Sequence, residues 1–279
     1  MNTNASVDLN HIDHVSRLAL ASNALQPIET GHVLVEDAGL PFVVKWIATP
    51  SSNPRHAKPG RGAGANPFAS PEAALTLGAL APNHLLLLNK YPVMDRHLLI
   101  VTRKYEPQTR PLTAGDFAAL AQIMAPNGGL GFYNGGEAAG ASQAHKHLQW
   151  IPDLPPLAAC LPEALATHGE AFDFAHAFTP LDDGLWAGDA AGDALAAHYQ
   201  RLLPITGWRP GDAATPPYNL LLTRQWMWLV PRGAEHWEHM SVNALGFAGS
   251  LFVKSRDRLA PLRAAGPMSA LRAVSLPPP

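Results

Sequence analysis

The spacing of apolar residues predicts two amphipathic helices in the first half of the chain. Apolar residues recur at helical intervals over residues 11–25, and Pro27 then ends the pattern. Residues 113–124 show the same period, with Thr113 placed to cap the first turn and Asn127, followed by two glycines, placed to end the last turn. We therefore expect both segments to be helices that bury one face.

Short runs of apolar residues predict β-strands. Residues 84–88 and 97–102 flank a turn-forming stretch, residues 89–96, which indicates two strands joined by a loop of eight residues. Further strands are expected at residues 42–47, 130–133, 144–151, 219–223 and 226–230, the last two forming a hairpin. Strands that come in pairs, with helices between them, favour an α+β fold over a doubly wound sheet.

Charge and composition exclude several classes of protein. The 20 basic residues nearly balance the 22 acidic ones and form no run, so the chain is poorly suited to binding nucleic acid. The single cysteine, Cys160, can form neither an internal disulfide nor a multi-thiolate zinc site, which fits a reducing compartment. No apolar run approaches the roughly 18–20 residues that span a bilayer, and Arg17 is the first cation, so we expect no membrane segment, no signal peptide and a cytoplasmic location.

The most informative part of the chain is residues 134–150. Side chains alternate between the two faces of a strand, so His145, His147 and Gln149 should project from one face and Lys146 from the other. Three polar groups are thus expected side by side, which is unusual for a strand in a core.

A turn rich in small residues comes just before this strand. Gly135, Gly136 and Gly140, with Ser142 and Gln143, offer backbone N–H groups and short polar side chains at close approach. Successive N–H groups in such a turn can form a concavity that holds phosphate oxygens. A pair of histidines beside a phosphate cradle indicates phosphorus chemistry.

Two other interpretations of the histidine pair stay open at this point. The histidines could be ordinary core or surface residues. They could also ligate zinc or iron, with a third histidine drawn from the rest of the chain, although Gln149 is a poor ligand and no carboxylate lies near in sequence. In a catalytic site, a neutral imidazole would instead be a nucleophile towards phosphorus, with an amide holding the non-bridging oxygens. The candidates for a third ligand are His84, His97, His236 and His239.

The order and spacing of several motifs resemble the diadenosine tetraphosphate (Ap4A) phosphorylase, or ATP adenylyltransferase, family, a transferase branch of the histidine-triad superfamily. The matching blocks run in order over most of the chain, at residues 66–68, 87–91, 97–103, 132–135, 140–149, 219–223, 226–228 and 241–249. The resemblance implies a histidine-triad-like antiparallel sheet with flanking helices and a C-terminal extension that closes the nucleotide site. It implies a nucleotidyltransferase region at residues 1–200 and an adenylyltransferase region at residues 201–279, packed as one unit.

The same resemblance implies a role for each residue of the strand. His147 would attack the α-phosphorus of Ap4A and become adenylylated, His145 would support the site, and Gln149 would orient the phosphate. Phosphate would then release ADP, so that the products are ATP and ADP. Since the imidazole must be unprotonated, we expect activity to fall below a pH near its pKa, which is about 6.5 when unperturbed. Sulfate could in principle replace phosphate.

The resemblance also implies a set of substrate contacts. Asn89 and Lys90 match a substrate-contacting pair in the family, and Asn134 matches a nucleotide contact. Lys58 matches an N-terminal lysine, and Lys254 lies where the C-terminal half closes over substrate. The remaining expected contacts are Gly140, Ala141, Ser142, Gln143, Asn243, Ala244 and Leu245.

Some features depart from the family or leave the function open. Lys45 stands where the family often has arginine, and Ser250 where it often has a larger apolar residue, which bears on the base and distal-phosphate preference. The enzymatic alternatives are a sugar-1-phosphate nucleotidylyltransferase, disfavoured by Lys146 and the lack of a cysteine-rich zinc site, and a hydrolase, disfavoured by Gln149. A non-catalytic nucleotide sensor is the third. We expect no tightly bound cofactor, Mg²⁺ only as companion of the polyphosphate, and a monomer or weak homodimer.

Overall fold

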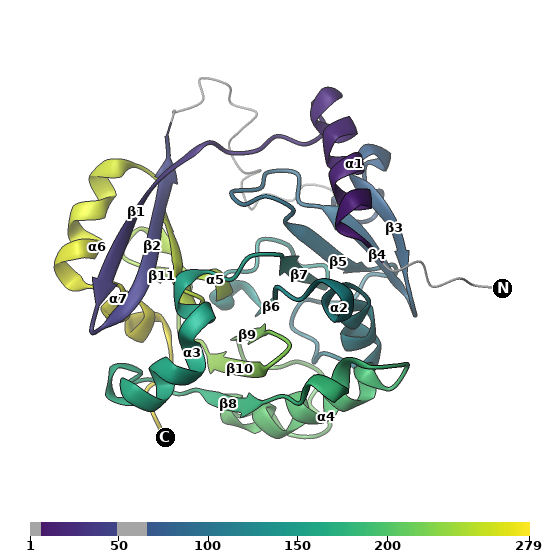
Figure 1. Cartoon of the computed structure of the whole chain (residues 1–279). Coiled ribbons are helices and arrows are strands. Elements are labelled where there is room, and N and C mark those ends of the chain that lie inside the picture. Colours follow the sequence, from purple (N-terminus) through teal and green to yellow (C-terminus); the bar gives the residue numbers. More distant parts are fainter. Residues whose placement is uncertain (1–6, 49–65) are drawn as a thin grey trace.

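The computed structural model describes residues 7–48 and 66–279 (Figure 1). Its centre is an antiparallel sheet of eight strands in the order β3-β4-β5-β7-β6-β9-β10-β8. These strands are β3 (Thr76–Leu80), β4 (His84–Leu88), β5 (Leu98–Thr102), β6 (Leu130–Gly135), β7 (His147–Ile151), β8 (Ala177–Pro180), β9 (Tyr218–Leu222) and β10 (Trp226–Pro231). Because β6 pairs with both β7 and β9, strands from the two halves of the chain share one sheet.

A second sheet stands beside the first, at the left of Figure 1. It consists of β1 (Thr30–Asp37), β2 (Leu40–Ile47) and β13 (Ser250–Val253), and β13 runs parallel to β2. The C-terminal part of the chain therefore returns to complete a sheet begun near the N-terminus. A small hairpin, β11 (His236–Trp237) with β12 (Met240–Ser241), precedes this return.

Helices cover both faces of the large sheet. The helices are α1 (Leu9–Ala21), α2 (Ala114–Asn127), α3 (Pro156–Thr167), α4 (Ala191–Leu202), α5 (Ala244–Phe247), α6 (Leu259–Ala265) and α7 (Pro267–Val274). One hydrophobic core lies between the sheet and α1, α2 and α4, and a second lies on the opposite face, towards the small sheet, α3, α5, α6 and α7. Within described residues, no helix is long and apolar enough to cross a membrane.

Strand side chains divide between the two cores with the expected period of two. On β7, Leu148 and Trp150 enter the core beneath α2, and so the other face of that strand is left for His147 and Gln149. On β10, Trp226 and Trp228 join the opposite core, as packing residues.

Most predicted elements are present, and the differences are local. Helix α2 is capped by Thr113, which accepts from the N–H of Asp116 while the Asp116 side chain accepts from the Thr113 N–H, and it ends at Gly128. The prediction of a strand from residue 144 was wrong at its start, because β7 begins at His147 and His145 forms only an isolated bridge to Pro107. The sequence patterns also missed β1, whose side chains are only partly buried or exposed and so carry no apolar run.

Candidate active site

His147 is the first residue of β7, and its ring is held in one tautomer. The backbone N–H of His147 donates to Gln108 Oε1 at 2.8 Å, which anchors the start of the strand. Its Nδ1 lies 2.8 Å from the carbonyl oxygen of His145, which can only accept, so Nδ1 carries the proton. The lone pair of the neutral ring is therefore on Nε2, which no described residue contacts by a hydrogen bond. This is the form of histidine that can attack phosphorus.

Burial keeps this ring neutral over a wide pH range. The side chain of His147 is almost fully buried, and desolvation lowers its pKa from 6.5 to about 4, with a smaller contribution from the nearby His145. The acid limit expected for activity therefore moves from about pH 6.5 towards about pH 4. The His147 ring is unprotonated well below neutral pH.

His145 supports the site through contacts on both ring nitrogens. The amide nitrogen of Asn66 donates to Nδ1 at 2.9 Å, and Nε2–H donates to the carbonyl oxygen of Thr102 at 2.8 Å. The Asn66 amide is itself oriented, since its oxygen accepts from the N–H of Phe68 at 3.0 Å. The Phe68 ring packs against both histidines, 5.7 Å from His145 and 5.3 Å from His147 between centroids. His145 thus fixes the backbone carbonyl that orients His147.

Gln149 is oriented by a relay that the sequence did not reveal. Asn89 Nδ2 donates to His97 Nδ1 at 3.0 Å, so the proton of His97 is on Nε2, which donates to Gln149 Oε1 at 2.9 Å. Burial lowers the pKa of His97 to about 4, so the ring stays neutral. With its oxygen occupied, Gln149 presents its amide nitrogen, a donor suited to a phosphate oxygen. The expected substrate contact Asn89 therefore positions His97.

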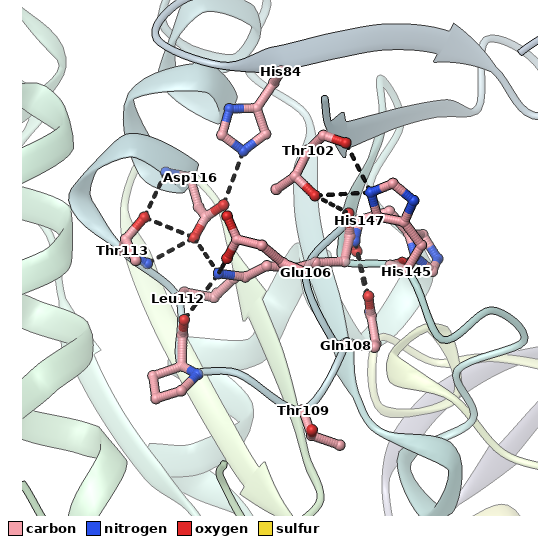
Figure 2. A network of polar contacts seen from close by, with 12 residues as sticks. His84, Thr102, Glu106, Gln108, Thr109, Leu112, Thr113, Asp116, His145 and His147 are labelled. Carbon is pink, nitrogen blue, oxygen red and sulfur yellow. Dashed lines mark hydrogen bonds and ion pairs between the residues drawn. The ribbon is translucent and has the colours of Figure 1, made fainter. Parts of the chain in front are cut away.

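Lys146 belongs to a buried polar network around Asp116, on the face of the sheet opposite His147. Figure 2 shows His84, Thr113 and Asp116 of this network. The Lys146 ammonium donates to the Asp116 carboxylate at 2.6 Å and to the carbonyl oxygen of Pro111 at 2.9 Å. The same carboxylate contacts His84 Nε2 at 2.9 Å. The network ties the start of β7 to the first turn of α2. Burial alone would raise the pKa of Asp116, but the contacts with His84 and Lys146 lower it to about 2.

The turn before β7, at residues 136–143, forms hydrogen bonds within its own backbone. The N–H of Gly140 donates to the carbonyl oxygen of Glu137 at 2.8 Å, and that of Ala141 to Gly136 at 3.2 Å. A substrate phosphate would compete with these two carbonyl oxygens, and the contacts expected from Gly140 and Ala141 stay predictions. Ser142 is exposed and Gln143 is half-buried, and they follow at the open end of the turn.

The turn contacts the C-terminal segment that was expected to close the site. Asn243 caps α5 by accepting from the N–H of Leu245 at 3.0 Å, and the N–H of Ala244 donates to Asn134 Oδ1 at 2.9 Å. A side chain at Gly140 would lie 2.7 Å from the Asn243 Cβ, so only glycine permits this close approach. Asn134 and Gly140 from the first half of the chain thus lie against Asn243 and Ala244 from the second half.

Two of the expected lysines, Lys90 and Lys254, reach solvent. Lys90 forms an ion pair with Glu72 at 2.5 Å, so a substrate phosphate would compete with that carboxylate. Lys254 is exposed immediately after β13. Lys58 lies outside the described residues. Lys45 on β2 is half-buried, and its ammonium donates to the carbonyl oxygen of Val93 at 3.4 Å.

The structure does not support the metal interpretation of the histidine pair. Across residues 7–48 and 66–279, no group of three or more His, Cys, Asp or Glu side chains is placed to hold a metal ion. His84 contacts Asp116 and His97 contacts Gln149, so two candidates for a third ligand are engaged elsewhere.

The site also contains polar residues that the sequence patterns did not single out. Gln108 donates from its amide to the carbonyl oxygens of Asn134 and His147 at 2.9 and 3.2 Å, which joins the two strands at the site. A lone glutamine in a loop carries no periodic signal, and only the fold shows its position. The others are Asn66, Thr102, Asn219 and Arg232.

Comparisons with known proteins agree with the fold. Residues 2–164 match a family model described as the Ap4A phosphorylase N-terminal domain, and residues 170–277 match the ATP adenylyltransferase C-terminal domain. The chain is 31% identical over 237 residues to Protein APA1 of Saccharomyces cerevisiae, which covers 72% of this chain and 73% of that protein.

A second yeast relative and a solved structure extend the likeness. Diadenosine 5',5'''-P1,P4-tetraphosphate phosphorylase 2 of Saccharomyces cerevisiae is 29% identical over 233 residues, 70% of each chain. The crystal structure of yeast Ap4A phosphorylase Apa2 in complex with Ap4A has the same fold, with a TM-score of 0.77 at 23% identity over 97% of both chains. On the family model over residues 2–164 and the identity to APA1, the chain belongs to the Ap4A phosphorylase family.

Proposed function

We propose that the protein catalyses the phosphorolysis of Ap4A to ATP and ADP through an adenylylated His147. The observation that carries the proposal is the ring of His147, which is neutral, held in the Nδ1–H tautomer, and free at Nε2. The yeast relatives named as Ap4A phosphorylases support the choice of substrate.

The reaction divides into two displacements at the same phosphorus atom. In the first, the Nε2 lone pair of His147 forms a bond to the α-phosphorus of Ap4A, and the bond from that phosphorus to the β-bridging oxygen breaks, releasing ATP. In the second, an oxygen of inorganic phosphate attacks the same phosphorus, the P–N bond breaks, and ADP leaves. In the first step ATP leaves through a phosphate oxygen and needs no proton. In the second step Nε2 of His147 is the leaving group and takes back its lone pair, which restores the neutral ring, while the new P–O bond makes ADP. The reverse sequence makes Ap4A and phosphate from ATP and ADP.

Positioning and charge stabilisation are the main tasks of the protein in such a reaction. The amide nitrogen of Gln149, fixed by His97, would donate to a non-bridging oxygen as negative charge rearranges around phosphorus. Lys90 and Lys254 would neutralise distal phosphates, with Lys90 leaving Glu72 for the substrate. Mg²⁺ would enter as the companion of the polyphosphate, and sulfate could replace phosphate in the second step.

The test is incubation of the purified protein with Ap4A, with and without inorganic phosphate, followed by chromatography of the nucleotides. The proposal predicts equal amounts of ATP and ADP that depend on phosphate and disappear in His147→Ala. The control is His236→Ala, which changes a histidine whose side chain is half exposed on β11 and should leave the rate unchanged. Phosphate-independent ATP and AMP would indicate a hydrolase, and binding without turnover would indicate a nucleotide sensor; either result would overturn the proposal.

A further inference from the structure

A chain of buried polar side chains leads from the C-terminal part of the protein to Asn134. It starts at Arg232, directly after β10, passes through Asn219 on β9, and ends at Asn134 on β6. Arg232 and Asn219 lie in the segment matched by the ATP adenylyltransferase C-terminal domain, and Asn134 lies in the segment matched by the Ap4A phosphorylase N-terminal domain.

Arg232 is a buried cation whose donors are all used by neutral oxygens. Its guanidinium donates to the carbonyl oxygens of Val274, Ala234 and Val242 at 3.0, 2.8 and 2.9 Å, and to that of Ala139 at 3.5 Å. The remaining N–H donates to Asn219 Oδ1. Since a guanidinium has five N–H donors and no acceptor, the five contacts account for the group completely.

This contact determines which way the Asn219 amide faces. Arg232 can only donate, so the Asn219 oxygen must point towards it and the Asn219 nitrogen must point away. That nitrogen donates to Asn134 Oδ1 at 2.9 Å and to the carbonyl oxygen of Ala139 at 2.9 Å. Both of its hydrogens are therefore used, and Asn219 has no second orientation of equal energy.

The orientation passes on to Asn134. Asn134 Oδ1 accepts from Asn219 and from the N–H of Ala244, at 2.9 Å each, so its two lone pairs are occupied by donors. Asn134 Nδ2 donates to none of the residues that the structure describes. Because the opposite orientation would place an N–H against two donors, the amide nitrogen of Asn134 is the end left for a ligand.

We propose that Arg232 and Asn219 are positioning residues that hold Asn134 with its amide nitrogen towards the nucleotide, where it donates to a substrate oxygen. The inference rests on the proposed function for the identity of the nucleotide. The C-terminal segment, through Arg232 and Asn219, would thus orient the amide donor of Asn134 in the N-terminal segment. Arg232 and Asn219 also both donate to the Ala139 carbonyl, which holds the turn at residues 136–143 against the same donors.

The test compares two substitutions of Asn219 whose order depends on the mechanism. Asn219→Asp keeps the size of the side chain and its contact with Arg232, but it replaces the donor facing Asn134 with an acceptor. Asn219→Ala removes the donor without replacing it. If Asn219 only fills space, Asn219→Asp should be the milder change. The proposal predicts the reverse, with kcat/KM for Ap4A reduced about 10- to 100-fold in Asn219→Asp and less in Asn219→Ala.

A second arm repeats both substitutions in an Asn134→Ala background. Once the oriented amide is absent, Asn219→Asp should reduce kcat/KM by no more than about 3-fold further, since both changes act on one donor. Unfolding midpoints are measured for every variant, and if Asn219→Asp does not fold, Asn219→Ala is compared in the two backgrounds instead. The matched control is Thr223→Val, a buried polar residue just beyond β9 whose hydroxyl accepts only from the N–H of Gln225, and it should leave kcat/KM unchanged.

Binding of AMP, measured by calorimetry, separates this inference from the proposed function. If the native chain shows no phosphorolysis, the proposed function fails, whereas the orientation of Asn134 is still measured by the weaker AMP binding expected for Asn219→Asp. Wild-type kcat/KM and AMP affinity in Asn219→Asp would overturn the inference. So would an equal loss from Asn219→Asp with and without Asn134, because it would show that Asn219 acts independently of that amide.

Discussion

Lowering the pH from 7.5 to 5.5 should barely slow the transfer of the adenylyl group to His147. Its burial lowers the pKa from 6.5 to about 4. With a pKa of about 4, roughly 97% of the rings are neutral at pH 5.5, whereas with an ordinary pKa of about 6.5 only roughly 9% would be. The two cases therefore differ about tenfold in rate at pH 5.5, which is a large margin for a kinetic measurement.

The assay is rapid-quench formation of ATP from subsaturating Ap4A without phosphate, which reports the free enzyme. Ap4A has no terminal phosphate, so the substrate lacks the second phosphate ionisation, with a pKa of about 6, that would distort the profile. Gln149→Ala is the control, because it should lower the rate at every pH without moving the acid limit. A rate that halves near pH 6.5 would refute the reasoning, since it would show that the ring of His147 titrates as if exposed.

Three further predictions follow from the buried groups. His97→Phe should reduce kcat/KM about tenfold by releasing Gln149, as measured in steady-state assays, and unchanged kinetics would contradict the relay. Lys146→Met should lower the free energy of unfolding by about 3–5 kcal/mol in urea titrations, because it leaves the buried Asp116 carboxylate without its ammonium partner. Adding Asp116→Asn should recover part of the loss, and no recovery would count against the ion pair. Because folding lowers the pKa values of His97 and His147, their neutral rings contribute about 3 kcal/mol each to the free energy of unfolding, complete above about pH 6.5 and lost towards pH 4. The free energy of unfolding should therefore depend less steeply on pH in His97→Phe, and an unchanged slope would contradict this.

The elements with strong local signals could be predicted from the sequence. Helix α2 has both its cap at Thr113 and its end at Gly128, and the alternation along β7 correctly separated His147 from Lys146. These signals are local, because a cap and a strand period depend on residues a few positions apart.

The supporting residues of the site could not be predicted, because their partners are distant in sequence. His97 lies 52 positions from Gln149, and Asn134 lies 85 from Asn219, so only the sheet brings each pair together. The depressed pKa of His147 was also out of reach, since burial is set by the whole fold. The internal hydrogen bonds of Gly140 depend on the turn geometry, which composition alone does not specify.

Adenylylation of His147 is tested most directly by mass spectrometry of the protein after mixing with Ap4A in the absence of phosphate. The two-step mechanism predicts a mass increase of one adenylyl group, located by peptide fragmentation on His147, with one ATP released per adduct. Addition of phosphate should remove the adduct and yield an equal amount of ADP. Phosphate-dependent ATP and ADP without an adduct, or an adduct on any residue other than His147, would contradict the mechanism.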